Sequence, residues 1–80
     1  MPKLKRLSGK EIIAIFNRFS FIVTSQKGSH VKLTKTLLSG ERQILTIPNH
    51  SELDTGTCRA IIRQATRYVP FEQLSPYFYS

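Results

Sequence analysis

The chain has 80 residues, with 12 Lys and Arg against five Asp and Glu, and a formal net charge of +7. A domain of this size buries only about 60% of the surface that its unfolded chain exposes, which leaves little room for a deep metabolite pocket. The positive charge favours a polyanionic partner, although charge alone does not distinguish RNA from DNA, an anionic membrane or an acidic protein. We therefore expect one domain over residues 1–80, with its chemistry on an open face or in a shallow groove.

The first predicted element is an amphipathic helix over residues 9–19. Ser8 and Glu11 have the spacing of a capping box, in which the hydroxyl and the carboxylate each accept an otherwise unpaired backbone N–H. One helical face then carries the apolar residues Ile12, Ile13, Phe16 and Phe19. The basic segment before this helix, residues 1–7, is expected to be flexible.

A three-stranded antiparallel sheet is expected next. Residues 21–24, the segment that begins at Ser29, and residues 44–47 are rich in β-branched residues or alternate between apolar and polar ones. Short glycine-containing connections at residues 26–28 and 39–40 join consecutive strands. Connections this short pair strands in the antiparallel direction.

A second helix should follow the sheet, capped by Asp54 or Thr55. Its apolar stripe consists of Cys58, Ile61, Ile62 and Ala65. Pro70 suits the first turn of a short terminal helix or tail over residues 70–80, whose length Pro76 limits. The order predicts an α+β fold with both main helices on one sheet face, as in the double-stranded-RNA-binding domain, and the other face open. Element order alone is weak support for any function.

His30 is the candidate catalytic residue. Alternation places it on the side of its strand opposite Val31 and Leu33. An imidazole can accept or donate a proton under cellular conditions, and a general base that deprotonates the RNA 2′-hydroxyl assists attack on the neighbouring phosphate by ~10²–10⁴-fold. The alternative is a surface histidine in a hairpin, which the chemistry alone slightly favours. His50 could supply a second proton or hold substrate, but a loop histidine with a structural hydrogen bond is the preferred interpretation.

Basic residues near His30 and on the second helix are candidates for RNA binding. Lys27 and Lys32 flank the histidine, and Ser29 directly precedes it. Arginines recur every four residues on the second helix, away from its apolar stripe, at Arg59, Arg63 and Arg67. Together with the net charge they could bind phosphates, whereas an ordinary solvated helix face explains any one of them separately.

Other mechanisms find less support in the sequence. The five carboxylates lack the paired spacing of two-metal nucleases, and helix capping explains Asp54 better than a divalent ion held with Glu52 does. Cys58 is the single cysteine, which excludes an internal disulfide and a cysteine-based zinc site, and its place on the apolar stripe indicates packing. We expect no metal and no cofactor. No apolar run approaches the roughly 20 residues that span a bilayer, so a cytoplasmic protein without a membrane partner is expected.

Four segments together resemble the HicA toxin family. They are Leu7-Ser8-Gly9-Lys10-Glu11-Ile12, Gly28-Ser29-His30-Val31, Thr46-Ile47-Pro48-Asn49-His50, and Gly56-Thr57-Cys58-Arg59-Ala60-Ile61-Ile62-Arg63-Gln64-Ala65. The resemblance runs from about Lys3 to Phe71. It implies a double-stranded-RNA-binding-like fold and ribosome-independent cleavage of messenger RNA centred on His30. It also implies a HicB-type antitoxin that covers the active face, and it carries over His50 with less weight.

The chain departs from this family in two places. Thr66 stands where a glycine usually follows the second helix, and the ending has Pro76 and three aromatic residues where an acidic, leucine-rich helix is common. The tail can therefore pack differently or face a partner. The leading hypothesis is a toxin endoribonuclease, an mRNA interferase. The alternatives are a non-catalytic RNA-binding module of the same fold and a protein-interaction module that uses the aromatic tail.

Overall fold

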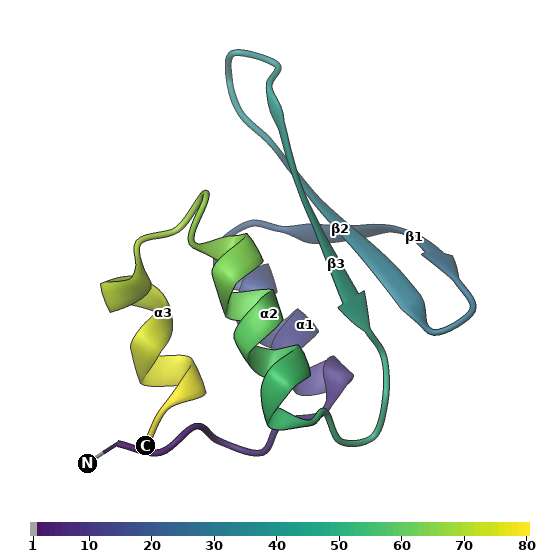
Figure 1. The fold of residues 1–80 in the computed structure, drawn as a ribbon. Coiled ribbons are helices and arrows are strands. Elements are labelled where there is room, and N and C mark those ends of the chain that lie inside the picture. The colour runs from purple at the N-terminus through teal and green to yellow at the C-terminus, as the bar shows by residue number, and fades with distance from the viewer. Residues whose placement is uncertain (1) are drawn as a thin grey trace.

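A computed structural model describes residues 2–80, so Met1 of the expected flexible segment 1–7 lies outside the described residues. Its elements, in chain order, are α1 (Gly9–Asn17), β1 (Ile22–Lys27), β2 (His30–Thr36), β3 (Arg42–Pro48), α2 (Thr55–Ala65) and α3 (Phe71–Phe78). The strands form one antiparallel sheet in the order β1-β2-β3, and both α1 and α2 contact β3. Figure 1 shows the helices gathered beside the sheet, while the β2–β3 hairpin projects beyond them. The predicted α+β fold is confirmed.

Helix α1 begins at the predicted capping box. The Glu11 N–H donates to Ser8 Oγ at 3.1 Å, and the Ser8 N–H donates to Glu11 Oε1 at 2.9 Å. The helix ends at Asn17, two residues before the predicted end, because the chain turns through Ser20 at a φ of 72°. Phe19 consequently lies in the turn, where its ring packs edge-on against Tyr77.

Two strands of the sheet, β1 and β3, are longer than the sequence predicted. β1 runs to Lys27 and β3 begins at Arg42, because the hairpin pairing extends past the apolar residues that suggested the strands. A break in register between Val23 and Ser25 marks a β-bulge in β1. At the opposite edge of the sheet, the Gln64 side chain of α2 accepts the Thr46 N–H of β3 at 2.9 Å. This hydrogen bond links α2 to the β3 edge of the sheet.

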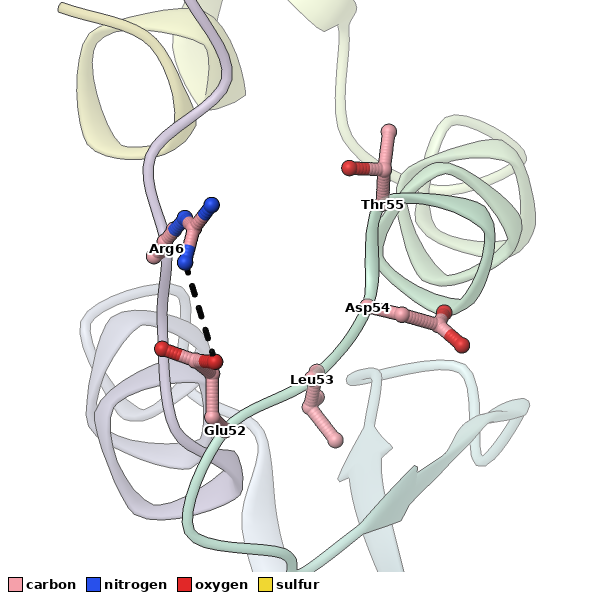
Figure 2. Close-up of a pocket in the computed structure, with 5 residues that line it drawn as sticks. All are labelled: Arg6, Glu52, Leu53, Asp54 and Thr55. Atoms are coloured by element: carbon pink, nitrogen blue, oxygen red, sulfur yellow. Dashed lines mark ion pairs between the residues drawn. The ribbon is translucent and has the colours of Figure 1, made fainter.

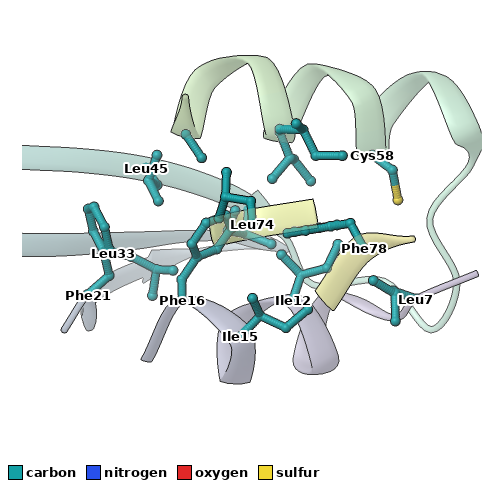
Figure 3. Close-up of a cluster of buried hydrophobic side chains, with 14 of the residues drawn as sticks. Leu7, Ile12, Ile15, Phe16, Phe21, Leu33, Leu45, Cys58, Leu74 and Phe78 are labelled. Atoms are coloured by element: carbon teal, nitrogen blue, oxygen red, sulfur yellow. The ribbon is translucent and has the colours of Figure 1, made fainter. Parts of the chain in front are cut away.

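The core lies between the helices and the inner face of the sheet (Figure 3). The sheet contributes Val31, Leu33, Leu45 and Ile47, and α2 contributes the four residues of its predicted stripe, Cys58, Ile61, Ile62 and Ala65. All eight side chains are buried. Burial of a large apolar side chain stabilises a fold by about 1.5–3 kcal/mol, so this layer is the main source of stability.

The C-terminal helix completes the core. Leu74 and Phe78 of α3 are fully buried, and the Phe78 ring lies 5.9 Å from that of Phe16. The sequence predicted Pro70 in the first turn of this helix, whereas Pro70 is the residue just before its first turn. The two ends of the chain are joined, since Lys3 and Ser80 exchange backbone hydrogen bonds of 2.8 and 2.9 Å. The expected flexibility of residues 1–7 is a statement about motion, which a single structure does not test, so it stays a prediction.

Candidate active site

The outer face of the sheet carries no helix and presents four rows of paired residues. Alternation along the strands points Val31, Leu33, Leu45 and Ile47 inward, so their neighbours point outward. The rows are Lys27–His30–Pro48, then Ser25–Lys32–Thr46, then Ile22–Thr34–Ile44, and finally Thr36–Arg42 at the hairpin end. We call this surface the open face. It lies on the side of the sheet opposite α1 and α2.

His30 occupies one corner of the open face as the first residue of β2. The turn before it has two residues, Gly28 and Ser29, and Gly28 has a φ of 60° while Ser29 is not left-handed. A positive φ at the first residue alone is the pattern of a type II′ hairpin turn, which favours glycine there. The Ser29 carbonyl accepts the Asn49 N–H at 2.6 Å, which ties the turn to the end of β3. The His30 side chain is exposed, and the hydrogen bond at Ser29 holds the backbone next to it.

His50 lies at the same end of the sheet. Its backbone carbonyl accepts the Gly9 N–H at 2.8 Å, which joins the loop after β3 to the start of α1. The structural hydrogen bond expected of this residue is thus made by its backbone. Its side chain is exposed, and among residues 2–80 no hydrogen bond connects it to His30.

The structure brings some of the predicted RNA-binding residues together with His30 and separates others. Lys27 lies directly opposite the histidine on β1, and Lys32 lies one row further along β2. Ser29 is half-buried in the turn. Arg59 and Arg63 are exposed on the side of α2 opposite its buried stripe, which faces away from the sheet. These two arginines therefore lie outside the strand pairs that form the open face.

Sequence reasoning missed Arg42. It lies on the open face opposite Thr36, on the same side of the sheet as Lys32. The third strand was predicted to begin at Ile44, which left Arg42 in the connection. The signal that could have found it is alternation: Arg42, Ile44 and Thr46 have the parity opposite to that of the inward-facing Leu45 and Ile47.

A hollow lies at the start of α2, away from His30 (Figure 2). Glu52 points toward Arg6, at 4.0 Å, and both side chains are exposed, so this ion pair contributes little to stability. Asp54 points the other way and caps α2, as predicted, by accepting the Thr57 N–H at 2.7 Å. Hydrogen bonds from the Thr57 side chain and backbone lower the pKa of Asp54. The two carboxylates therefore have separate partners.

Cys58 is buried in the core, as its position on the apolar stripe predicted. Burial, with a smaller effect from the nearby Asp54 charge, raises the pKa of its thiol. A protonated, enclosed thiol is a poor nucleophile, which supports a packing role. Nowhere in residues 2–80 do three or more His, Cys, Asp or Glu side chains gather in a group that could hold a metal ion.

A family model for the HicA toxin of bacterial toxin–antitoxin systems matches residues 9–66. This segment includes α1, the whole sheet and α2, and therefore the open face with His30 and the loop with His50. Comparison with curated proteins gave no significant match, and comparison with solved structures gave none either. Over residues 2–80, none of the helices has the length and apolar character needed to cross a membrane. Because the matched segment is well over half of the chain, the protein belongs to the HicA family and is a toxin of a toxin–antitoxin system.

Proposed function

We propose that this toxin is an endoribonuclease that cleaves messenger RNA on its open face, with His30 as the general base or acid. The observation that carries the proposal is the place of His30, exposed at a corner of the uncovered sheet face with Lys27 and Lys32 nearby. An uncovered face accepts a long polymer, which an enclosed pocket in so small a domain could not do. A messenger RNA substrate would fit the cytoplasmic location expected from the sequence.

The chemistry uses proton transfers without a cofactor. A base removes the proton of an RNA 2′-hydroxyl, the 2′-oxygen bonds to the adjacent phosphorus, and the bond from phosphorus to the 5′-oxygen breaks. An acid then gives a proton to the departing 5′-oxygen. Lys27 and Lys32 offset the negative charge that grows on the phosphate oxygens. His50, at the same end of the sheet, is the candidate for the second proton-transfer group, with less support than His30.

The substrate should be single-stranded. The 2′-oxygen must align with the breaking bond, and an A-form duplex holds the backbone in a fixed geometry that offers mainly its shape for recognition. Arg59 and Arg63 remain candidates for contacts with RNA away from the cut, because they face another side of the molecule. A HicB-type antitoxin would neutralise the toxin by covering the open face.

The test is cleavage of a long, weakly structured RNA by purified protein in the presence of EDTA. We expect the parent to cut, and a His30→Ala variant with an unchanged Tm to be inactive. His50→Ala serves as the matched histidine control and should lose less activity than His30→Ala.

Two outcomes would contradict the proposal. Equal cleavage by the parent and the His30→Ala variant would remove His30 from the chemistry. RNA binding by both proteins with cleavage by neither would favour the non-catalytic RNA-binding module, for which the cations of the open face would still provide the contact surface.

A further inference from the structure

We infer that a hollow in the open face binds the sugar–phosphate backbone of single-stranded RNA beside the cut, and that Arg42 is an RNA-binding residue there. This inference rests on the proposed function and states where the substrate lies. It assigns a role to a residue that the sequence analysis passed over.

The hollow is shallow, with a volume of about 340 Å³. Its lining comes from all three strands and consists of Thr24, Ser25, Lys32, Thr34, Thr36, Arg42 and Ile44. Lys32 is two residues from His30 along β2, and strand residues advance by ~3.3 Å each, so the hollow begins about 7 Å from the histidine. Arg42 pairs with Thr36, six residues from His30, which places its backbone roughly 20 Å away along the strand.

The chemistry of the lining favours an extended anion. Lys32 and Arg42 supply positive charge at two points along the strands, and four hydroxyl groups lie among them. The Thr24 hydroxyl donates to the Lys32 carbonyl at 3.4 Å and lies 2.8 Å from the Thr34 hydroxyl, so both hydroxyls keep an acceptor lone pair for a ribose hydroxyl, while Lys32 and Arg42 meet the phosphates. No carboxylate is among the residues that line the hollow. The lining therefore suits phosphate oxygens and ribose hydroxyls rather than a metal ion.

Apolar side chains complete the fit to a nucleotide chain. Ile44 is 38% exposed within the hollow, and Ile22, in the same row across Thr34, is 62% exposed. The carbon face of a ribose or a base can cover these side chains while its phosphate meets a cation. The line from His30 past Lys32 to Arg42 then follows one strand direction, so a single extended RNA segment can contact the catalytic corner and both cations.

The site can be tested by binding alone. In a His30→Ala background, the affinity for an unstructured oligouridine is measured at several salt concentrations, with and without Arg42→Gln. We expect Arg42→Gln to weaken binding roughly three- to tenfold and to reduce the slope of log K against log salt by about 0.7, the value for one lost phosphate contact on a single strand.

The matched control is Arg18→Gln. It removes the same charge from the helical side of the molecule, where the Arg18 guanidinium lies 5.6 Å from the centre of the Tyr77 ring. Arg18→Gln should change the RNA affinity less than Arg42→Gln does, and Arg42→Lys should recover part of the loss. Arg42 is exposed, so its variants should retain the Tm of the parent.

The outcomes separate this inference from the proposed function. Equal effects of Arg42→Gln and Arg18→Gln, or no oligouridine binding even at low salt, would overturn the binding site whatever the protein cleaves. Binding that depends on Arg42 in a protein that cuts no RNA would keep the site and refute the ribonuclease. Unchanged RNA affinity with weakened binding of a HicB-type antitoxin would assign the hollow to a protein partner, and thereby overturn the inference.

Discussion

Gly9 is the point at which the first helix meets the loop that follows β3. A Cβ atom at this position would collide with the Pro48 carbonyl oxygen and would lie 2.6 Å from Asn49 Cα and 3.0 Å from the His50 nitrogen. All three neighbours are backbone atoms, which cannot move aside as the end of a flexible side chain can. Gly9→Ala must therefore push the helix away from the loop and disturb the hydrogen bond from the Gly9 N–H to His50.

The expected magnitude follows from three contributions. Overpacking costs about 1–3 kcal/mol. Loss of the hydrogen bond costs about 0.5–1.5 kcal/mol. Replacing glycine by alanine in a compatible conformation stabilises the fold by only about 0.4–1 kcal/mol, because the unfolded chain has less conformational entropy. We expect a net loss of about 0.5–4 kcal/mol, which lowers the Tm of a domain of this size by at least ~2 °C.

The assay is thermal unfolding, with Gly56→Ala as the matched control. A Cβ at Gly56, in the first turn of α2, would meet only Asp54 Oδ1 at 3.8 Å, which is ordinary contact. Gly56→Ala should therefore stabilise the protein by about 0.4–1 kcal/mol, opposite in sign to Gly9→Ala. A Gly9→Ala variant as stable as the parent would refute the close approach. Because the Asn49 N–H also bonds to the Ser29 carbonyl, the displaced loop should reduce cleavage as well.

Two further predictions concern the core. Phe78→Ala should lower the free energy of unfolding, measured in urea, by about 3–5 kcal/mol because the ring is fully buried. Phe71→Ala, at an exposed ring, should lower it by less than half as much. Equal losses would mean that α3 does not stabilise the core. Burial raises the pKa of the Cys58 thiol, so folding favours the protonated form, and its contribution to stability is complete below the ordinary thiol pKa of about 8.5 and is lost above it. The parent should therefore lose stability faster than Cys58→Ala as the pH rises past about 8.5, and identical slopes would contradict the burial effect.

Local sequence signals predicted the fold well because they depend on near neighbours. The capping box at Ser8 and Glu11 requires residues three apart, and the apolar stripe of α2 requires only helical periodicity. The ends of elements were less predictable. The end of α1 depends on the left-handed turn at Ser20. Non-glycine residues seldom adopt this conformation, and no local sequence pattern predicts it here.

The arrangement of the candidate site depended on information that the sequence carries only weakly. The outward position of His30 could be predicted because strand parity fixes which way a side chain faces. Parity within one strand says nothing about how the second helix packs, so the sequence offered Arg59 and Arg63 as RNA-binding candidates without placing them relative to His30. The role of the aromatic tail was also open, because burial of Leu74 and Phe78 depends on contacts with residues far away in the sequence.

The residues that stabilise this toxin and the residues proposed to act on RNA lie on opposite faces of the sheet. The inner face, the helices and the segments that connect them contain the buried side chains, including those of α3, which lies outside the segment matched to the family. The proposed working residues Lys27, His30, Lys32 and Arg42 are all exposed. Exposed substitutions of this kind change stability by only about 0.5 kcal/mol in either direction. Losses of cleavage or binding from the open face should therefore occur at constant Tm, whereas a variant that loses activity and stability together identifies a residue of the inner layer.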